Sequence, residues 1–559
     1  MSNPIDLLVI GAGLHGLAVA KTYSESLPQA KILIVDSADS IGGVWAQERL
    51  YPGLKTNNVV GSYEFSDFPM GLKRYGLEPG QHIPGPVVHR YLCDFAHHFD
   101  LFRRTRLRTK VEAATLGEDG TWCVEFASGC GSESLMARNI AVATGLTSQP
   151  LSPSYPGLQD RFNGKFFHAV DLSSQANHLR DANGHVVVIG ANKSAWDVCY
   201  TAATASPEAT VHMLIRAGGR GPSWMWRRRG LLGNALSISR ITSTRVFTWF
   251  DPNPLASATQ RYFTASWLGR VLCAMFWAFL DCLVLWTSGY ISISTRLAPL
   301  RPRFSTFWMG NSLSVHNYET DWFDLVRDGR IIVHHAEIEA FKDGNTVHLS
   351  DGQVIDHVTV VVACTGWKHT PNVCFSGIEK GGGVLEEEDK SETLQHLNNI
   401  CPSIQLLCKK QPPRTRASST SSPPLQLYRF MTPLNPQLNH FNNLVFVGFY
   451  QSVHTTLVAQ AQAVWSSAFL QRALSPVDAQ TCRQWTHCNM AYQQMRRLGS
   501  PFPDLVLDAL PYIDLLLEDV GLRRLRKKGR WRNLVEQHRP ADYRGLVEEW
   551  RQVQQSRGS

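Results

Sequence analysis

The stretch Leu7-Leu8-Val9-Ile10-Gly11-Ala12-Gly13-Leu14-His15-Gly16 decides the fold of this chain. An apolar run ends in a Gly-x-Gly-x-x-Gly turn, a helical pattern follows, and a second apolar run ends in Asp36. Strand, glycine turn, helix, strand and acid together form the fingerprint of a dinucleotide-binding unit. Gly11 permits the tight turn, Gly13 lets the backbone approach a pyrophosphate, and Gly16 lets helix and strand pack closely. Asp36 is placed to accept a hydrogen bond from a ribose hydroxyl.

A second, weaker fingerprint begins at His185. Its buried strand meets Gly190-Ala191-Asn192-Lys193-Ser194-Ala195, in which Asn192 and Ala195 replace two of the usual glycines. Gly190 keeps the first glycine, and Ser194 is a candidate donor to a phosphate at the helix N-terminus.

The second fingerprint differs from the first in the charge that follows its second strand. That strand, 210–215, ends in Arg216, at the place where the first unit has Asp36. An acid repels a 2′-phosphate, whereas an arginine binds it bidentately. The first unit is therefore predicted to bind FAD or NAD, and the second NADPH.

Length and composition exclude several classes of protein. A chain of 559 residues is too long for one hydrophobic core and predicts two or three domains. The net charge of +8 is mild, and no basic tract interleaved with aromatic residues indicates nucleic-acid binding. The twelve cysteines include no Cys-x-x-Cys pair, so neither a metal site nor a dithiol redox centre is expected. The first strand begins almost at Met1, so we expect no signal peptide and a cytoplasmic protein.

Short motifs between the fingerprints add candidates for the first nucleotide site. Gly42-Gly43-Val44-Trp45 lets the backbone pass close to a cofactor, and Trp45 can cover one face of a flat ring. Asn57 lies in a polar loop expected to face the same site. Two strands end in Thr-Gly turns, at Thr144 and at Thr365, and each follows a dinucleotide unit. This repetition predicts paired crossings between two domains.

Residues 220–330 fit no simple α/β repeat and predict a helical, apolar insertion. Within it, Leu268–Trp286 is nearly continuous apolar sequence, about long enough to span a bilayer. Asp281 would cost on the order of 3 kcal/mol near the centre of a membrane helix. Three readings stay open, namely a buried or substrate-covering helix, an interfacial anchor on a membrane surface, and a true span.

The last third of the chain is expected to return to the first domain. Residues 409–424 are rich in Ser, Thr, Pro and basic side chains and predict a disordered loop. Leu444-Val445-Phe446-Val447-Gly448 reads as a buried strand, and the helix Thr456–Leu470 should place its N-terminus at the first cofactor. Arg523–Arg532 is a dense basic run, read first as a solvated face of C-terminal helices.

These observations predict an α/β fold with two Rossmann-like domains. The FAD-binding domain takes residues 1–160 and 371–559, and the NADPH-binding domain takes residues 161–370, with the helical insertion inside it.

In combination, the motifs resemble those of the class B flavoprotein monooxygenases, which include flavin-containing, Baeyer–Villiger and N-hydroxylating enzymes. The likeness extends over most of the chain and is greatest to fungal flavin monooxygenases of secondary metabolism. It is carried, besides the two fingerprints, by Gly42–Trp45, Thr56-Asn57, Phe162-x-Gly164-x-x-x-His168 and Thr365-Gly366-Trp367.

The resemblance implies that NADPH reduces FAD and that O2 then gives a flavin C4a-hydroperoxide, which oxygenates a hydrophobic small molecule. It implies that Asn57 positions the peroxide or the nicotinamide, and that His168 holds the interdomain connection. Leu172 departs from the family, because an aromatic residue usually follows the histidine by four positions. This departure weakens a Baeyer–Villiger assignment but leaves it open.

Other classes of function predict different observations. A disulfide reductase with two dinucleotide units requires the missing Cys-x-x-Cys pair. A flavin dehydrogenase would pass electrons onward without placing oxygen in a product. A non-catalytic FAD-binding scaffold would hold a flavin that NADPH does not bleach. The oligomeric state is not indicated by any pattern.

Overall fold

The protein is described here from a computed structural model. The residues that it describes are 3–128, 131–218, 220–227, 240, 242–251, 253, 255, 258–290, 295–308, 310–342, 344–377, 393, 395–397, 399, 425–496 and 502–558. The predicted disordered loop, 409–424, lies outside them.

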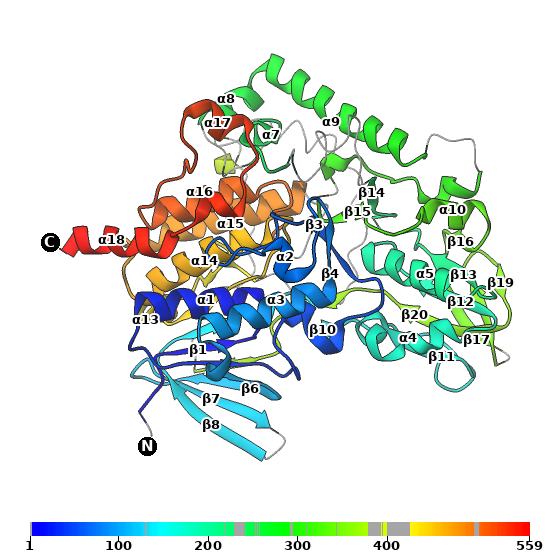
Figure 1. Cartoon of the computed structure of the whole chain (residues 1–559), viewed down its shortest axis with the longest axis horizontal. Helices are drawn as coiled ribbons and strands as arrows, with labels where there is room; N and C mark the ends of the chain where they lie inside the picture. The colour runs from blue at the N-terminus through cyan, green and yellow to red at the C-terminus, as the bar shows by residue number, and fades with distance from the viewer. Residues whose placement is uncertain are drawn as a thin grey trace.

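The molecule has two structural halves, and the first is formed by both ends of the chain. It is built on a five-stranded, all-parallel sheet in the order β25-β9-β1-β2-β5 (Figure 1). Its strands are β1 (Leu7–Ile10), β2 (Ile32–Val35), β5 (Thr105–Arg106), β9 (Ile140–Val142) and β25 (Leu444–Phe446). All four residues of β1 are buried, which is why this strand reads as a continuous apolar run rather than an alternating one. Because β25 joins a sheet that begins at residue 7, the C-terminal third returns to the first domain.

Helices cover one face of this sheet and a second sheet covers the other. The covering helices are α1 (Leu14–Ser26), α3 (Gly85–His98), α14 (Thr455–Leu470) and α16 (Ala509–Asp519), and their apolar faces form the largest core. The opposite layer consists of β6 (Thr109–Leu116), β7 (Trp122–Ser128), β8 (Gly131–Ala137) and β22 (Cys374–Ser376). Trp122, Val124 and Phe126 alternate along β7 and fill the space between the two sheets.

Shorter elements complete the first half. They are α2 (Leu72–Tyr75), β3 (Lys55–Val59), β4 (His82–Pro84), β23 (Leu427–Tyr428), β24 (Thr432–Pro433), α13 (Pro436–Phe441), α15 (Ala479–Arg496), α17 (Arg530–Val535) and α18 (Leu546–Gly558).

The second half contains another five-stranded, all-parallel sheet, in the order β11-β20-β12-β13-β16. Its strands are β11 (Lys165–His168), β12 (His185–Ile189), β13 (Thr210–Leu214), β16 (Ile331–His334) and β20 (Val358–Ala363). Helices α4 (Leu172–Arg180), α5 (Lys193–Ala205) and α10 (Trp322–Arg327) flank it, together with a small antiparallel sheet of β17 (Ile338–Lys342), β18 (Thr346–Leu349) and β19 (Val354–Ile355). The prediction of two parallel, Rossmann-like units is therefore confirmed.

The chain passes between the halves along a short antiparallel pair. β10 (Gln149–Pro150) pairs with β21 (Trp367–Lys368), directly after the two Thr-Gly turns. Thr365 Oγ1 donates to Leu151 O at 2.5 Å and fastens the crossings to each other. The predicted paired crossings are confirmed.

The insertion between β13 and β16 has its own small core. It contains β14 (Trp224–Arg227), α7 (Arg245–Thr248), α8 (Ala258–Ala265), α9 (Trp267–Thr287) and β15 (Leu313–His316). Aromatic side chains of β14, α7 and α9 pack with Phe307 in this core. Of the readings of 268–286, burial is wrong for most of the helix surface, because only the side of α9 that faces this core is buried. A substrate-covering helix stays a prediction.

Candidate active site

The turn after β1 leaves no room for a side chain at Gly11 or at Gly16. Gly11 has φ +116°, and a Cβ there would lie 2.5 Å from Ala143 O. A Cβ on Gly16 would lie 1.9 Å from Gly11 O, so strand and helix are in backbone contact. Gly13 precedes α1 in extended conformation, which leaves the free N–H groups of the first helical turn at the end of the strand. This is the geometry that a diphosphate needs.

A second glycine turn packs against the first. Gly42 N donates to Ala12 O at 3.1 Å, and a Cβ on Gly43 would lie 3.0 Å from Gly13 Cα. Trp45 follows in a single 3₁₀ turn, and its indole Nε1 donates to the hydroxyl of Tyr63 at 2.9 Å. The structure thus brings Trp45 beside the first fingerprint, as the sequence predicts.

Asp36 lies at the end of β2, beside the glycine turn. One carboxylate oxygen accepts from Ala12 N at 2.7 Å and the other from Ala38 N at 2.9 Å. These bonds fix the carboxylate beside the turn. An ionised carboxylate has about four acceptor sites, so acceptors remain for a ribose hydroxyl.

Strand β3 carries Asn57 between two anchored neighbours. Thr56 is buried; its hydroxyl donates to Asn58 O at 2.7 Å and accepts from Ile83 N at 3.0 Å. Asn58 Nδ2 donates to Val453 O at 2.7 Å, which ties β3 to the segment before α14. The amide oxygen of Asn57 is buried and has no hydrogen-bond partner in the described part of the chain. A buried acceptor without a partner calls for an explanation, and a bound ligand is one explanation for an acceptor beside a cofactor cradle.

Two threonine hydroxyls share this property. Thr144 Oγ1, in the turn after β9, and Thr456 Oγ1, in the first turn of α14, are buried and unpartnered among the described residues. The sequence indicated Thr144 but not Thr456. The predicted helix is confirmed as α14, and its N-terminus meets β3 through Asn58.

Gly448 follows β25 and faces the first turn of α1. It has φ +77°, and a Cβ would lie 2.8 Å from the ring of His15. His15 Nε2 lies 2.7 Å from the hydroxyl of Tyr450, and burial lowers the pKa of His15 to about 4. The imidazole is therefore neutral at pH 7 beside the helix N-terminus. No local pattern predicts this His15–Tyr450 pair, because the two residues are 435 positions apart.

The second fingerprint forms a similar cradle. Gly190 has φ +145°, and a Cβ would lie 2.7 Å from Cys364 O. Asn192 occupies the N-cap position of α5, and its Oδ1 accepts from Ser223 Oγ at 3.2 Å. Ser194 lies exposed in the first turn of α5, and Arg216 lies exposed beyond β13. The side chain of Ala195 is fully buried, so the fold accommodates a methyl group where the usual motif has glycine.

A polar network joins the two halves beside β3. Lys193 Nζ donates to Asp197, to Asn317 Oδ1 at 2.9 Å and to the hydroxyl of Tyr318 at 3.0 Å. Tyr51, from the first half, and Tyr318 donate to Asp197 at 2.9 and 2.8 Å.

Asn317 completes this network. Its Nδ2 donates to Thr56 O at 3.1 Å, one residue before Asn57. Burial lowers the pKa of Lys193, and the nearby charge of Asp197 opposes this shift. Sequence analysis missed the network, since its members come from three distant segments, at residues 51–56, 193–197 and 317–318. The i, i+4 spacing of Lys193 and Asp197 on α5 was its only local signal.

His168 holds the interdomain connection, as the resemblance implied. Its Nδ1 accepts from Val170 N at 3.1 Å, so its Nε2 donates to Gly366 O at 3.2 Å. The ring also lies edge-on to Trp367. Burial lowers the pKa of His168, which keeps the imidazole neutral at pH 7. Leu172 is buried at the start of α4, where it packs in the core of the second half.

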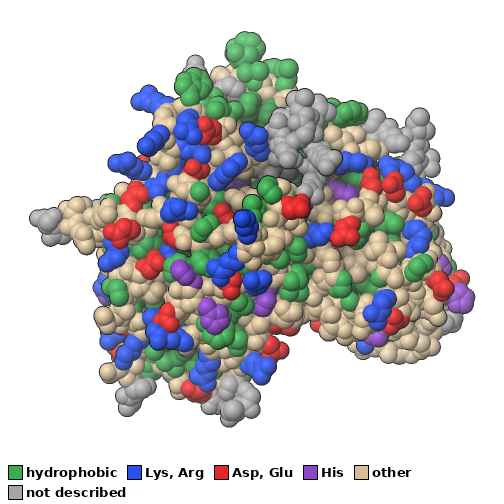
Figure 2. Space-filling model, in the orientation of Figure 1, with side chains coloured by type: hydrophobic (Ala, Val, Ile, Leu, Met, Phe, Trp, Pro, Cys, Tyr) green, Lys and Arg blue, Asp and Glu red, His purple; other side chains and the backbone are tan. Residues whose placement is uncertain are grey.

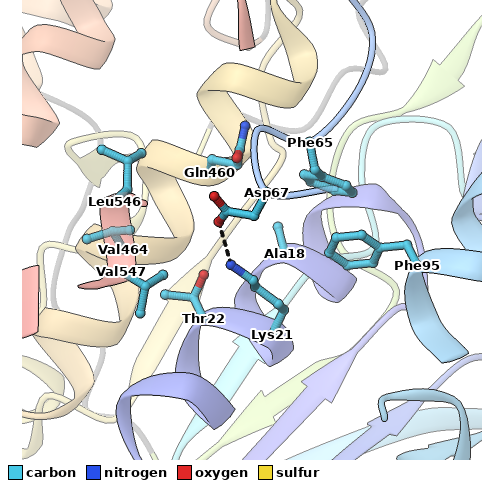
Figure 3. Close-up of a pocket in the computed structure, with 10 residues that line it drawn as sticks. All are labelled: Ala18, Lys21, Thr22, Phe65, Asp67, Phe95, Gln460, Val464, Leu546 and Val547. Atoms are coloured by element: carbon cyan, nitrogen blue, oxygen red, sulfur yellow. Dashed lines mark hydrogen bonds and ion pairs between the residues drawn. The ribbon is translucent and has the colours of Figure 1, made fainter. Parts of the chain in front are cut away.

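A small pocket between α1, α14 and α18 is separate from these cradles (Figure 3). Its volume of about 20 Å³ holds roughly one water molecule, too little for an organic substrate. Lys21 Nζ donates to Asp67 Oδ2 across it at 2.7 Å, and Gly545 N donates to Asp67 Oδ1 at 2.9 Å. The pocket is thus part of the contact that fastens the C-terminal segment to the first domain.

Comparison with known proteins agrees with this geometry. The model of the flavin-binding monooxygenase-like family matches residues 6–263. A protein described as FAD-dependent monooxygenase resA, from Aspergillus sclerotiorum, is 32% identical, with 99% of each chain covered. An FAD-dependent monooxygenase from Pyrenophora dematioidea is 33% identical over 94% of this chain and 99% of its own. The chain belongs to the class B flavin monooxygenase family.

Solved structures show that this flavin monooxygenase has the fold of that family. Cyclohexanone monooxygenase in its open form superposes with a TM-score of 0.63 at 17% identity, covering 92% of this chain and 98% of the other. The enzyme from Rhodococcus sp. Phi1 bound to NADP+ superposes with a TM-score of 0.60 at 19% identity, covering 93% and 98%. The predicted FAD and NADPH agree with these findings.

The residues of this flavin monooxygenase fit both cofactors. The glycine turns around Gly11, Gly13 and Gly43 would hold the FAD diphosphate, and the unpartnered oxygens of Asn57 and Thr144 would offer polar atoms to the flavin. The turn at Gly190, the first turn of α5 and Arg216 would hold NADPH. The individual roles of these residues remain predictions.

Proposed function

We propose that this flavin monooxygenase uses NADPH to place one oxygen atom from O2 into a hydrophobic small molecule of secondary metabolism. The observation that carries the proposal is the buried, unpartnered Asn57 Oδ1, held where the two dinucleotide units meet. FAD, when bound, would accept the hydride of NADPH and activate oxygen.

The chain's own residues would orient the reactants and keep water out. Thr56 and Asn58 fix the backbone on both sides of Asn57, so its amide is pre-positioned. The Lys193–Asp197 network would set the nicotinamide unit against the flavin unit. In this proposal the neutral side chains of His15 and His168 have structural roles and transfer no proton.

The insertion supports a hydrophobic substrate. β15 ends at His316, next to Asn317, whose amide reaches β3. β15 pairs with β14, whose Trp224 and Trp226 lie in the aromatic core of the insertion. An apolar layer is thereby attached directly to the segment that carries Asn57. The names of the fungal relatives, FAD-dependent monooxygenases, support the same class of reaction.

The test uses the purified flavoprotein with NADPH and two probe substrates in ¹⁸O2. Thioanisole reports oxygenation at sulfur, and cyclododecanone reports oxygen insertion beside a carbonyl. We expect NADPH to bleach the flavin without oxygen, and one labelled atom to appear in a product with oxygen. A flavin that NADPH does not bleach would favour the scaffold. A flavin that NADPH bleaches but that O2 does not reoxidise would favour a flavin dehydrogenase that passes its electrons to another acceptor.

A variant gives the residue-level test of the proposal. Asn57→Ala removes the amide that would hydrogen-bond to the bound cofactor, and a buried partner left unsatisfied costs about 1–3 kcal/mol. We expect retained FAD, but roughly tenfold less product per NADPH consumed. Unchanged coupling would contradict the role of Asn57. Val354→Ala, an exposed change on β19, is the matched control.

A further inference from the structure

Helix α9 presents a long apolar face that the described residues leave open to solvent. Seven large side chains at helical spacing are between 38% and 72% exposed, namely Trp267, Leu268, Val271, Leu272, Met275, Phe279 and Trp286. Arg270 is the only charged residue among the exposed positions of α9. Hydrophobic side chains gather along the upper edge in Figure 2, where Figure 1 places α9. An apolar surface of this extent marks an interaction site.

The opposite face of α9 is fixed to the protein. Trp277, Leu280 and Val284 are buried in the core of the insertion. Asp281 accepts from the backbone N and the hydroxyl of Thr306, at 2.9 and 2.6 Å. α9 is long and apolar enough to cross a membrane. A span would, however, take Asp281 from these donors into hydrocarbon, so the geometry favours a helix that lies flat on a surface.

A basic segment accompanies this apolar face. Seven of the ten residues from Arg523 to Arg532 are Lys or Arg. Arg523, Lys528 and Arg530 are exposed and form no ion pair with another described residue. Trp531 and Leu525, 76% and 52% exposed, lie between these cations. Cations interspersed with an exposed tryptophan suit the headgroup region of an anionic membrane.

Helix α7 connects the two surfaces. Arg245, at its start, pairs with Asp514 and donates to Arg524 O at 2.9 Å, which holds the basic segment. Two residues later, the ring of Phe247 packs edge-on against Phe276 and Trp277 of α9, with centroids 5.6 and 5.9 Å apart. α17, α7, α8 and α9 accordingly lie along one side of the molecule in Figure 1. The apolar face and the cations can therefore contact one flat surface at the same time.

We propose that α9 and the basic segment 523–532 form a docking surface for an anionic lipid bilayer. The apolar face enters the boundary between headgroups and acyl chains, and the cations contact anionic headgroups. A second copy of the chain fits this surface less well. A two-fold interface that covered the whole surface would bring both basic segments into one contact, where like charges repel.

Vesicle flotation of the full-chain holoenzyme tests the proposal. The probes are phosphatidylcholine vesicles with and without phosphatidylserine, at low and high salt. We expect binding to the anionic vesicles that weakens with salt. M275E/F279E should lower the bound fraction roughly tenfold or more, because both apolar side chains would be replaced by charges at the boundary with the acyl chains. K528E/R530E should lower binding at low salt more than at high salt.

Val354→Glu is the matched control, because Val354 is 47% exposed on β19 of the second half, away from α9. Retained flavin absorbance shows that each variant is folded. Wild-type protein that fails to float, or M275E/F279E that floats like wild type, overturns the proposal. A dimer in solution that M275E/F279E converts to monomer, without vesicle binding by the wild type, assigns the face to self-association and also overturns it.

Discussion

At the residue scale, the two nucleotide sites differ in the charge of one side chain. Asp36 and Arg216 follow the second strand of their respective units, and their signs are opposite. Asp36 is held by two backbone N–H groups, whereas Arg216 is exposed beyond β13. An exposed guanidinium at this strand end is accessible to a 2′-phosphate, so the preference for NADPH over NADH is expected to depend on Arg216.

Arg216→Ala should raise the KM for NADPH by roughly 10–100-fold, because a charged hydrogen bond contributes about 1.5–3 kcal/mol. The KM for NADH and the FAD content should change little, since neither ligand carries the 2′-phosphate. Steady-state kinetics with both nucleotides measures the effect. Lys165 is an exposed cation at the opposite end of the sheet, so Lys165→Ala should leave the ratio of the KM for NADPH to the KM for NADH unchanged. Equal losses with NADPH and NADH would show that Arg216 has only a structural role.

At the scale of elements, polar side chains fasten the two dinucleotide units together. Asp197 on α5 accepts from Lys193, from Tyr318 and from Tyr51 of the first half. Asn317 continues the network to β3. The element that binds the nicotinamide nucleotide is thus coupled to the strand that carries Asn57.

Asp197→Asn should slow flavin reduction at saturating NADPH while the FAD content is retained. The variant keeps the shape of the side chain but leaves the half-buried Lys193 without its counter-charge. The KM for NADPH should change less than the reduction rate, because the phosphate-binding residues are untouched. Stopped-flow absorbance under anaerobic conditions measures the rate. Tyr51→Phe, which removes one of the three donors, should show a smaller effect. If the flavin of Asp197→Asn is reduced at the wild-type rate, the network does not position the two units.

A buried ion pair fixes the insertion to the C-terminal helices. Arg496 of α15 pairs with Asp251 at 2.7 Å, and the side chains are 2% and 1% exposed. The guanidinium also lies over the rings of Phe307 and Trp277. Because a lone buried carboxylate is costly, loss of Arg496 should loosen the insertion before the rest of the fold.

Arg496→Met should destabilise the insertion by about 3–5 kcal/mol, the usual effect of breaking a buried pair. We expect faster limited proteolysis within residues 240–300, with flavin fluorescence changing later. Arg103→Met breaks an exposed pair with Asp100 and should change the cleavage rate little, because exposed pairs contribute about 0–1 kcal/mol. Cleavage that begins in the first domain would contradict this assignment.

At the scale of the whole molecule, buried histidines determine the response to acid. Burial lowers the pKa of His15, His454 and His538 to about 4, and burial together with His334 and His185 lowers that of His212 to about 3. In the unfolded chain these groups titrate near 6.5. As the pH falls below about 6.5 the unfolded state binds protons first, so stability falls until the folded values near 4 are reached.

The thermal midpoint should therefore decrease between pH 7 and pH 4, and most of the loss should occur below pH 6.5. Intrinsic tryptophan fluorescence during heating, at a fixed scan rate, measures it. His212→Gln should flatten this dependence, since the most strongly shifted group is removed. His178→Gln, an exposed change on α4, should leave it unaltered. A midpoint that stays constant across this range would show that the buried histidines are not neutral in the folded protein.

The sequence by itself determined the two nucleotide-binding units. Their glycines, strand ends and charges lie within about 30 neighbouring residues, and local backbone geometry requires those residue types at those spacings. The paired Thr-Gly crossings and α14 were predicted for the same reason.

Only the tertiary structure decided which side chains meet between the units. Asn317 reaches β3, Tyr51 reaches α5, and His15 meets Tyr450 across more than a hundred residues each. The tertiary structure also decided which face of α9 is buried, because hydrophobicity alone does not distinguish a buried apolar face from an exposed one. Packing against Phe307 and the Asp281–Thr306 bonds turn one side of that helix inward and leave the other for solvent. Local patterns encode backbone geometry, whereas contacts between distant segments depend on how the whole chain packs.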